Sequence, residues 1–165
     1  MQKVTLLLGS NAPDAEALVG MATDILGIAV GKIENISRDH RSAPYGFTAD
    51  REFVNRAVVL TTEHDAYEVL RRINLIEALL GRDRTEEQRV KSAKGEAYAS
   101  RPIDIDIIFY GQMTFNDERL TIPYHFLDQR EYALRPVVDV VAEFQHPDLA
   151  STPRAMLEAL TRNLE

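Results

Sequence analysis

One ten-residue stretch constrains the fold more than any other, the sequence Arg101-Pro-Ile-Asp-Ile-Asp-Ile-Ile-Phe-Tyr110. Apolar and acidic side chains alternate along it, which predicts a β-strand because successive side chains point to opposite faces of a sheet. The opposite face of this strand carries two carboxylates, Asp104 and Asp106. The apolar face is expected to join a hydrophobic core through Ile103, Ile105, Ile107 and Phe109.

The two carboxylates lie roughly 7 Å apart along such a strand and repel each other unless a cation is near. A pair of oxygen ligands on a rigid element suits Mg²⁺, which completes its shell with water and substrate phosphates. This interpretation predicts a nucleotide-using phosphoryl or pyrophosphoryl transferase. In the alternative interpretation, the strand lies at a sheet edge and its acidic face stays in water and discourages edge pairing. The alternation by itself leaves both open.

The composition is that of a soluble globular protein, and residues 1–165 are expected to form a single domain. The chain is 45% hydrophobic and 27% charged. Its net charge of −7 argues against an extended nucleic-acid surface, which needs a basic face. The chain has no cysteine, and no apolar run is long enough for a signal segment or a membrane span. A cytoplasmic protein with no nucleic-acid or membrane partner is therefore expected.

Strands and helices are mixed without the regular alternation of a doubly wound sheet, so the pattern predicts the α+β class. Helices are expected over residues 13–26, ended by Gly27, and over residues 65–80, ended by Gly81. Thr152 and Pro153 begin a last helix with a buried stripe of methionine and leucine. Other strands are expected at 4–8, 28–40 and 53–61, one helical turn within 126–132, and a short apolar element at 135–141.

Four features have two interpretations each. Asn55 lies on an otherwise apolar strand face, where it either satisfies nearby backbone or contacts a ligand. Glu77, near a helix C-terminus, either pairs with a cation or is solvated, and solvation is the commoner case. The polar segment 82–100 is either a tolerated insertion or an active-site lid, and its position before the two aspartates favours the lid. Gly9 either belongs to a turn after the first strand or begins a phosphate-binding loop, and it lacks the neighbouring glycines and lysine of such a loop.

Several motifs occur in an order and spacing that resemble a known enzyme family. They are Gly9-Ser-Asn11, Arg41-Ser-Ala-Pro-Tyr-Gly46, Phe53-Val-Asn55, Glu77 with Gly81-Arg-Asp-Arg84, Arg101-Pro-Ile-Asp-Ile-Asp-Ile107, and Glu118-Arg-Leu-Thr-Ile-Pro123 followed by Arg130. Together they resemble 6-hydroxymethyl-7,8-dihydropterin pyrophosphokinase, a folate-biosynthesis enzyme that moves pyrophosphate from ATP to a pterin alcohol. The resemblance runs nearly end to end. It implies a ferredoxin-like α+β sandwich, a mainly antiparallel sheet with helices packed on it, in a monomer.

The resemblance also implies roles for individual residues. Asp104 and Asp106 match ligands of two Mg²⁺ ions, and Asp104 also borders the pterin. Arg82 and Arg84, in a mobile active-site loop at 82–100, and Arg101 match residues that contact phosphate, with ATP as co-substrate. The pterin side comprises Ser42, Ala43, Tyr45, Phe53, Asn55 and Tyr132. The nucleotide side comprises Asn74, Glu77, Arg101, Ile107, Arg119, Thr121, Tyr124, His125 and Arg130.

The sequence departs from the family pattern at two places. Many members have His-Tyr after the proline where this chain has Tyr124-His125, so either residue is a candidate for the role of the family's histidine. An Arg-Trp-Gly-Pro motif is replaced by Ala97-Tyr-Ala-Ser100, which removes one loop cation. The alternative to an active enzyme is a catalytically impaired ferredoxin-like module that binds a nucleotide or a pterin without turnover.

Overall fold

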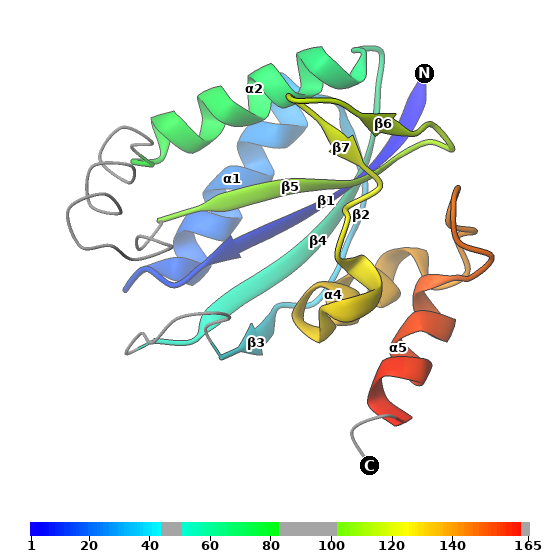
Figure 1. Cartoon of the computed structure of the whole chain (residues 1–165). Coiled ribbons are helices and arrows are strands. Elements are labelled where there is room, and N and C mark those ends of the chain that lie inside the picture. Colours follow the sequence, from blue (N-terminus) through cyan, green and yellow to red (C-terminus); the bar gives the residue numbers. More distant parts are fainter. Residues whose placement is uncertain (44–50, 83–101, 163–165) are drawn as a thin grey trace.

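The computed structural model describes residues 1–43, 51–82 and 102–162. A five-stranded antiparallel sheet forms the centre of the molecule, with strands in the order β2-β4-β1-β5 and with β3 also paired to β4 (Figure 1). Its strands are β1 (Gln2–Ser10), β2 (Lys32–Ile36), β3 (His40–Ser42), β4 (Phe53–Thr62) and β5 (Asp104–Tyr110). Two short strands, β6 (Phe115–Asn116) and β7 (Thr121–Ile122), form a separate hairpin.

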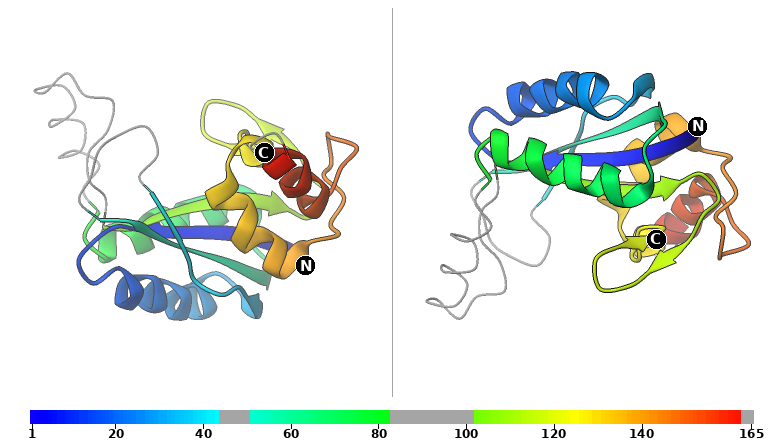
Figure 2. Two further views of the ribbon diagram at one scale, coloured as in Figure 1. Left: turned by 90° about the horizontal axis from the view of Figure 1, so that it is seen from below. Right: turned by 90° about the horizontal axis from the view of Figure 1, so that it is seen from above.

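Helices cover both faces of the sheet, as Figure 2 shows. Helices α1 (Ala15–Ala29) and α2 (Ala66–Leu79) lie on one face, and α4 (Glu131–Val141) and α5 (Pro153–Arg162) on the other, after the 3₁₀ turn η1 (Leu127–Gln129). With β3 set aside, the order is βαββαβ, and each crossover helix joins two strands that flank a third. This is the ferredoxin-like arrangement, and it confirms the expected α+β sandwich. Among the described residues, no helix has the length and apolar character needed to cross a membrane.

Two hydrophobic cores follow from the alternation of side chains along the strands. On β1, Val4, Leu6 and Leu8 pack under α1 and α2, whereas Leu7 packs under α4. Strand β4 divides in the same way, with Val54, Val58 and Leu60 on the α1 side and Ala57 on the α4 side. Central strands covered on both faces are therefore apolar along most of their length.

Helices α2 and α5 begin with side-chain caps, and α2 ends at the predicted glycine. The Asp65 carboxylate accepts a hydrogen bond from the Glu68 backbone N–H at 2.8 Å at the start of α2. Gly81 ends that helix with φ +102°, a conformation that strongly favours glycine. At the start of α5, the Thr152 hydroxyl accepts from the Ala155 N–H at 3.2 Å. Side-chain caps and left-handed glycines are local signals, and the sequence located Thr152 and Gly81 in this way.

Helix α1 continues past Gly27 to Ala29, so the predicted stop at Gly27 and the predicted strand at 28–40 are wrong. The helix continues because Leu26 and Ala29 still pack on the core, and Gly27 lies against the side chain of Ile33. The strand begins only at Lys32 and is divided into β2 and β3.

The helical turn expected within 126–132 is confirmed as η1, whereas the short apolar element expected at 135–141 is part of the longer helix α4, with Pro136 inside it. Proline lacks the N–H that would donate a helical hydrogen bond. Ala133, Leu134 and Val137 of α4 are buried in the second core, and their burial compensates for that missing hydrogen bond.

Strand β5 follows the predicted alternation as far as Ile107 and then departs from it. Its pairing with β1 shifts register there, because Leu6 pairs with Ile107 and Thr5 with Phe109. Ile108 is the additional residue of a β-bulge, which reverses the faces of the sheet to which the following side chains point. Phe109 therefore points into the α4 core, against the ring of Phe144 at 4.4 Å, and not into the core of Ile103 and Ile105 as expected.

Candidate active site

A row of neighbours on adjacent strands defines the floor of the candidate site. In register, Gly9 of β1 lies between Asn55 of β4 and Asp104 of β5, all on the α4 face of the sheet. The next row is Ala57, Leu7 and Asp106. Asn55 and Asp104 are thus two strand spacings apart, roughly 10 Å. Gly9 has no side chain to fill the space between them, and a Cβ there would lie 3.2 Å from Asn55 Oδ1.

The Asp104 carboxylate is paired with a buried arginine. Arg82 Nη1 donates to Asp104 Oδ1 at 2.8 Å and to Glu77 Oε2 at 2.7 Å, and the side chains of Arg82 and Glu77 are 4% and 1% exposed. The backbone N–H of Ile105 also donates to Glu77 Oε2, at 2.9 Å. Of the two interpretations of Glu77, the solvated one is therefore wrong. Glu77 pairs with a cation, and that cation is Arg82. Glu77 joins the end of α2 to the start of β5.

Strand β5 is the edge strand of the sheet, as the alternative interpretation of the aspartates expected. Their acidic face is not simply wet, however. The Asp104 side chain is 33% exposed and shares Arg82 with a buried carboxylate. The donor chemistry also fits Mg²⁺, because that ion uses one or two protein carboxylates and does not need a cluster of three. Across the described ranges, no group of three or more potential metal-ligating side chains is present.

Two tyrosines lie over the aspartates on the α4 side. The Tyr124 N–H donates to the Ile108 carbonyl at 3.0 Å, and the Tyr124 and Tyr132 hydroxyls are 3.2 Å apart. Burial raises the pKa of both phenols, and the negative charges of Asp104 and Asp106 raise it further. The positive charge of Arg130 lowers the Tyr132 pKa, so the Arg130 guanidinium also acts on this pair of tyrosines. Both tyrosines therefore remain neutral hydrogen-bonding groups beside the carboxylates.

The expected pterin side is formed by β3 and β4. Ser42 pairs with Phe53 across the two strands, and Asn55 Nδ2 donates to Ser42 Oγ at 2.7 Å. Asn55 is 3% exposed, so its amide orientation is set by this bond. Ala43 follows β3 and is exposed. Tyr45 lies outside the described residues.

The expected nucleotide residues are more scattered. Arg119 lies beside the β6–β7 hairpin with its guanidinium 5.2 Å from the centre of the Tyr67 ring, at the opposite end of α2 from Glu77. Thr121, His125 and Asn74 are exposed, whereas Ile107 faces the α1–α2 core. Arg130 packs 4.7 Å from the centre of the Phe126 ring. Arg84, Arg101 and the rest of the 82–100 segment after Arg82 lie outside the described residues.

The described residues therefore place two carboxylates and an asparagine amide on one face of an α+β sandwich, with a buried arginine bonded to one of the carboxylates. These parts are typical of an enzyme that transfers phosphoryl or pyrophosphoryl groups. Residues 5–142 match the model of the 7,8-dihydro-6-hydroxymethylpterin-pyrophosphokinase family, and the chain belongs to that family. This confirms the enzyme class and reaction expected from the sequence, ATP-dependent pyrophosphoryl transfer to the pterin alcohol in folate biosynthesis.

Curated relatives and a solved structure agree with this assignment. The 2-amino-4-hydroxy-6-hydroxymethyldihydropteridine pyrophosphokinase of Porphyromonas gingivalis is 33% identical over 154 residues, 93% of this chain and 99% of the relative. The enzyme of the same name from Methylorubrum extorquens is 33% identical over 163 residues, 98% and 94% of the two chains. The HPPK-DHPS protein of Plasmodium falciparum with pteroate shares the fold, with a TM-score of 0.76 at 17% identity, over 99% of this chain and 43% of that chain.

Proposed function

We propose that this chain carries out the family reaction above Gly9, with the pterin on the Asn55 side and the ATP phosphates on the side of the two aspartates. The single observation that carries this placement is the cross-strand row in which Gly9 separates Asn55 from Asp104. We propose that the space above Gly9 forms a pterin recess, since the two strand spacings between Asn55 and Asp104, roughly 10 Å, suit a flat bicyclic ring. The Asn55 amide can form hydrogen bonds with the pterin, and the two aspartates can hold the Mg²⁺ ions that accompany the ATP phosphates.

On the pterin side, Asn55 is proposed to bind the polar edge of the ring, since Ser42 holds its amide in one orientation. Such preorganisation lowers the entropy cost of binding. Phe53 and Tyr132 come from β4 and α4, on either side of the recess, and are proposed to sandwich the ring. Ser42, Ala43 and Tyr45 complete this side.

On the phosphate side, Asp104 and Asp106 are proposed to hold two Mg²⁺ ions. Bound Mg²⁺ neutralises triphosphate charge and favours loss of the proton from the attacking hydroxyl. Arg82 lies within hydrogen-bond reach of Asp104 and is proposed, with Arg84, Arg101 and Arg130, to bind phosphate oxygens. The proposed nucleotide side includes Asn74, Glu77, Ile107, Arg119 and Thr121, and Tyr124 rather than the exposed His125 in the role of the family's histidine.

The chemistry needs positioning more than a strong base. The pterin hydroxymethyl oxygen forms a bond to the β-phosphorus in line with the bond to the bridging oxygen, which breaks as AMP leaves. The hydroxyl proton is released to water or to an aspartate. The neutral phenols of Tyr124 and Tyr132 can donate hydrogen bonds beside the carboxylates without adding negative charge.

The test is AMP release from Mg-ATP with and without 6-hydroxymethyl-7,8-dihydropterin. Pterin-dependent AMP is expected, together with the pterin diphosphate in equal amount. AMP without pterin would indicate hydrolysis. Binding of both substrates without AMP would favour the non-catalytic module. Titration with Mn²⁺ in the presence of a non-hydrolysable ATP analogue, followed by electron paramagnetic resonance, counts the ions, and one ion per chain would contradict the two-ion proposal.

We further propose that the enzyme acts as a monomer in the cytoplasm. The proposed residues Asn55, Asp104 and Tyr132 all come from one chain, so no second subunit is needed to complete the site. The reaction also needs a compartment that supplies ATP. Sedimentation of the active protein tests the first statement.

A further inference from the structure

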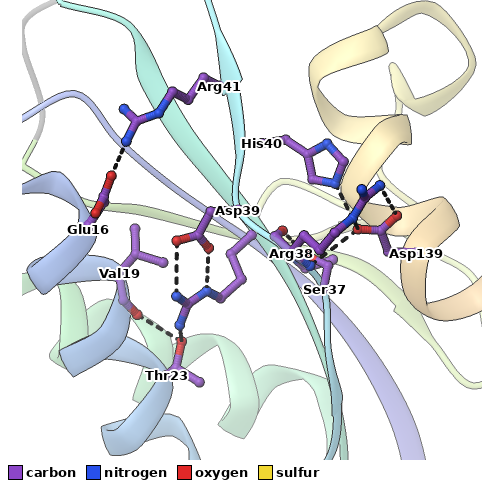
Figure 3. A network of polar contacts seen from close by, with 11 residues as sticks. Glu16, Val19, Thr23, Ser37, Arg38, Asp39, His40, Arg41 and Asp139 are labelled. Carbon is purple, nitrogen blue, oxygen red and sulfur yellow. Dashed lines mark hydrogen bonds and ion pairs between the residues drawn. The ribbon is translucent and has the colours of Figure 1, made fainter.

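A cluster of charged side chains joins α4 to residues 38–40, the segment that leads into β3 (Figure 3). Asp139 of α4 accepts hydrogen bonds from the backbone N–H, Nε and Nη2 of Arg38, at 3.2, 3.3 and 3.2 Å. His40 Nε2 lies 2.8 Å from Asp139 Oδ2. The side chains of His40 and Asp139 are only 17% and 18% exposed. One carboxylate therefore holds four polar contacts at the boundary between helix and strand.

The segment is held from its other face by different residues. Asp39 accepts from Arg56 Nε at 2.7 Å, and Arg56 Nη1 donates to Thr23 of α1 at 3.2 Å. Arg38 and His40 thus attach the segment to α4, and Asp39 between them attaches it through Arg56 to α1. Partial burial raises the pKa of Asp139, but the hydrogen bonds from Arg38 and His40 outweigh it, and the pKa lies below its ordinary value. The carboxylate is consequently ionised at neutral pH and remains a full partner for the arginine.

The cluster connects two elements that carry residues of the proposed pterin recess. His40 pairs with Asn55 in register, and Ser42, two residues further along β3, accepts the Asn55 amide. Tyr132 precedes Asp139 by about two helical turns, so both lie on the same side of α4. Asp139 therefore links the helix that carries Tyr132 to the strand that carries Ser42.

We propose that Asp139, through Arg38 and His40, is a positioning residue that sets the distance between α4 and β3 and so the width of the pterin recess. This inference rests on the pterin placement proposed above. Asp139 touches neither substrate in that placement. Its loss should loosen the recess on the α4 side while leaving the aspartates and Arg82 in place, because these are held by β5 and α2.

The experiment compares Asp139→Asn with Asp39→Asn, which removes the carboxylate that holds the same segment from the α1 side. For Asp139→Asn we expect the pterin KM, and the pterin Kd from fluorescence titration, to rise about tenfold. The ATP KM and kcat should stay within about twofold of wild type. For Asp39→Asn the pterin Kd should change much less. Equal changes in the two variants, or an unchanged pterin Kd in folded Asp139→Asn, would overturn the proposal.

A second variant keeps the test decisive if Asp139→Asn does not fold. Arg38→Lys removes the two-pronged contact but keeps the charge and the backbone N–H, and its side chain is 80% exposed. Arg38→Lys should also raise the pterin Kd. In the double variant, the two effects should not add, because both substitutions remove the same contact. An unchanged Kd there would contradict the inference. Absence of pterin-dependent AMP release in the wild type would instead contradict the proposed function.

Discussion

Replacement of Glu77 by glutamine tests the buried ion pair that supports the aspartate strand. The Glu77 carboxylate accepts from Arg82 Nη1 at 2.7 Å and from the Ile105 N–H at 2.9 Å. Removing one partner of a buried ion pair costs about 3–5 kcal/mol, because the remaining charge stays desolvated. Arg82 keeps Asp104 as a partner, so we expect the lower end, about 3 kcal/mol.

The assay is urea unfolding followed by far-ultraviolet circular dichroism, since the chain has no tryptophan. With a slope of about 2 kcal/mol per molar urea, this loss moves the unfolding midpoint down by about 1.5 M.

The matched control is Glu68→Gln on the same helix, whose carboxylate pairs with Arg71 and Arg72 at the surface. Solvent screening makes such pairs weak, so its midpoint should move much less. If Glu77→Gln shifts the midpoint no more than the control does, the argument from burial is refuted.

Three further predictions concern the recess and the tyrosines beside it. Asp106→Ala should abolish pterin-dependent AMP release while the circular dichroism spectrum and unfolding midpoint stay close to wild type, and loss of folding would instead indicate a structural role. Gly9→Ala should raise the pterin KM more than the ATP KM, because the new Cβ lies 3.2 Å from Asn55 Oδ1 and narrows the floor; an unchanged pterin KM would exclude this floor as the binding surface. Above pH 10, near the pKa of an unfolded tyrosine, the unfolded state releases a proton that folded Tyr124 retains, so the free energy of unfolding should fall as the pH rises. In the Tyr124→Phe variant, the free energy of unfolding, measured by urea titration at successive pH values, should fall less steeply with pH than in the wild type. Parallel curves for the two proteins would contradict the raised pKa of Tyr124.

Much of the fold could be predicted because its signals are local. The alternation up to Ile107 placed both aspartates on one face of a strand, and the apolar periodicity over 65–80 with Gly81 gave the ends of α2 within one residue. The motif order also identified the family, since the spacing of the arginines and aspartates is a property of the sequence itself.

The errors in the prediction occur where distant parts of the chain compete with a local signal. Gly27 is compatible with a helix end, but core contacts on both sides of it extend α1. The bulge at Ile108 depends on the pairing of β5 with β1, a hundred residues earlier, and it sends Phe109 to the opposite core. Pro136 stays within α4 because burial of its neighbours outweighs one missing hydrogen bond.

By itself, the sequence determined the α+β class, the family, and the residue types available for metal, phosphate and pterin. The tertiary structure alone decided which of them meet: Arg82 with Glu77 and Asp104, Ser42 with Asn55, and Asp139 with Arg38 and His40. The physical reason is that side-chain alternation, caps and turns act over a few residues, whereas an ion pair depends on where the sheet brings remote segments together. The contact between Asp139 and His40 joins residues 99 positions apart, and no local pattern near either one predicts it.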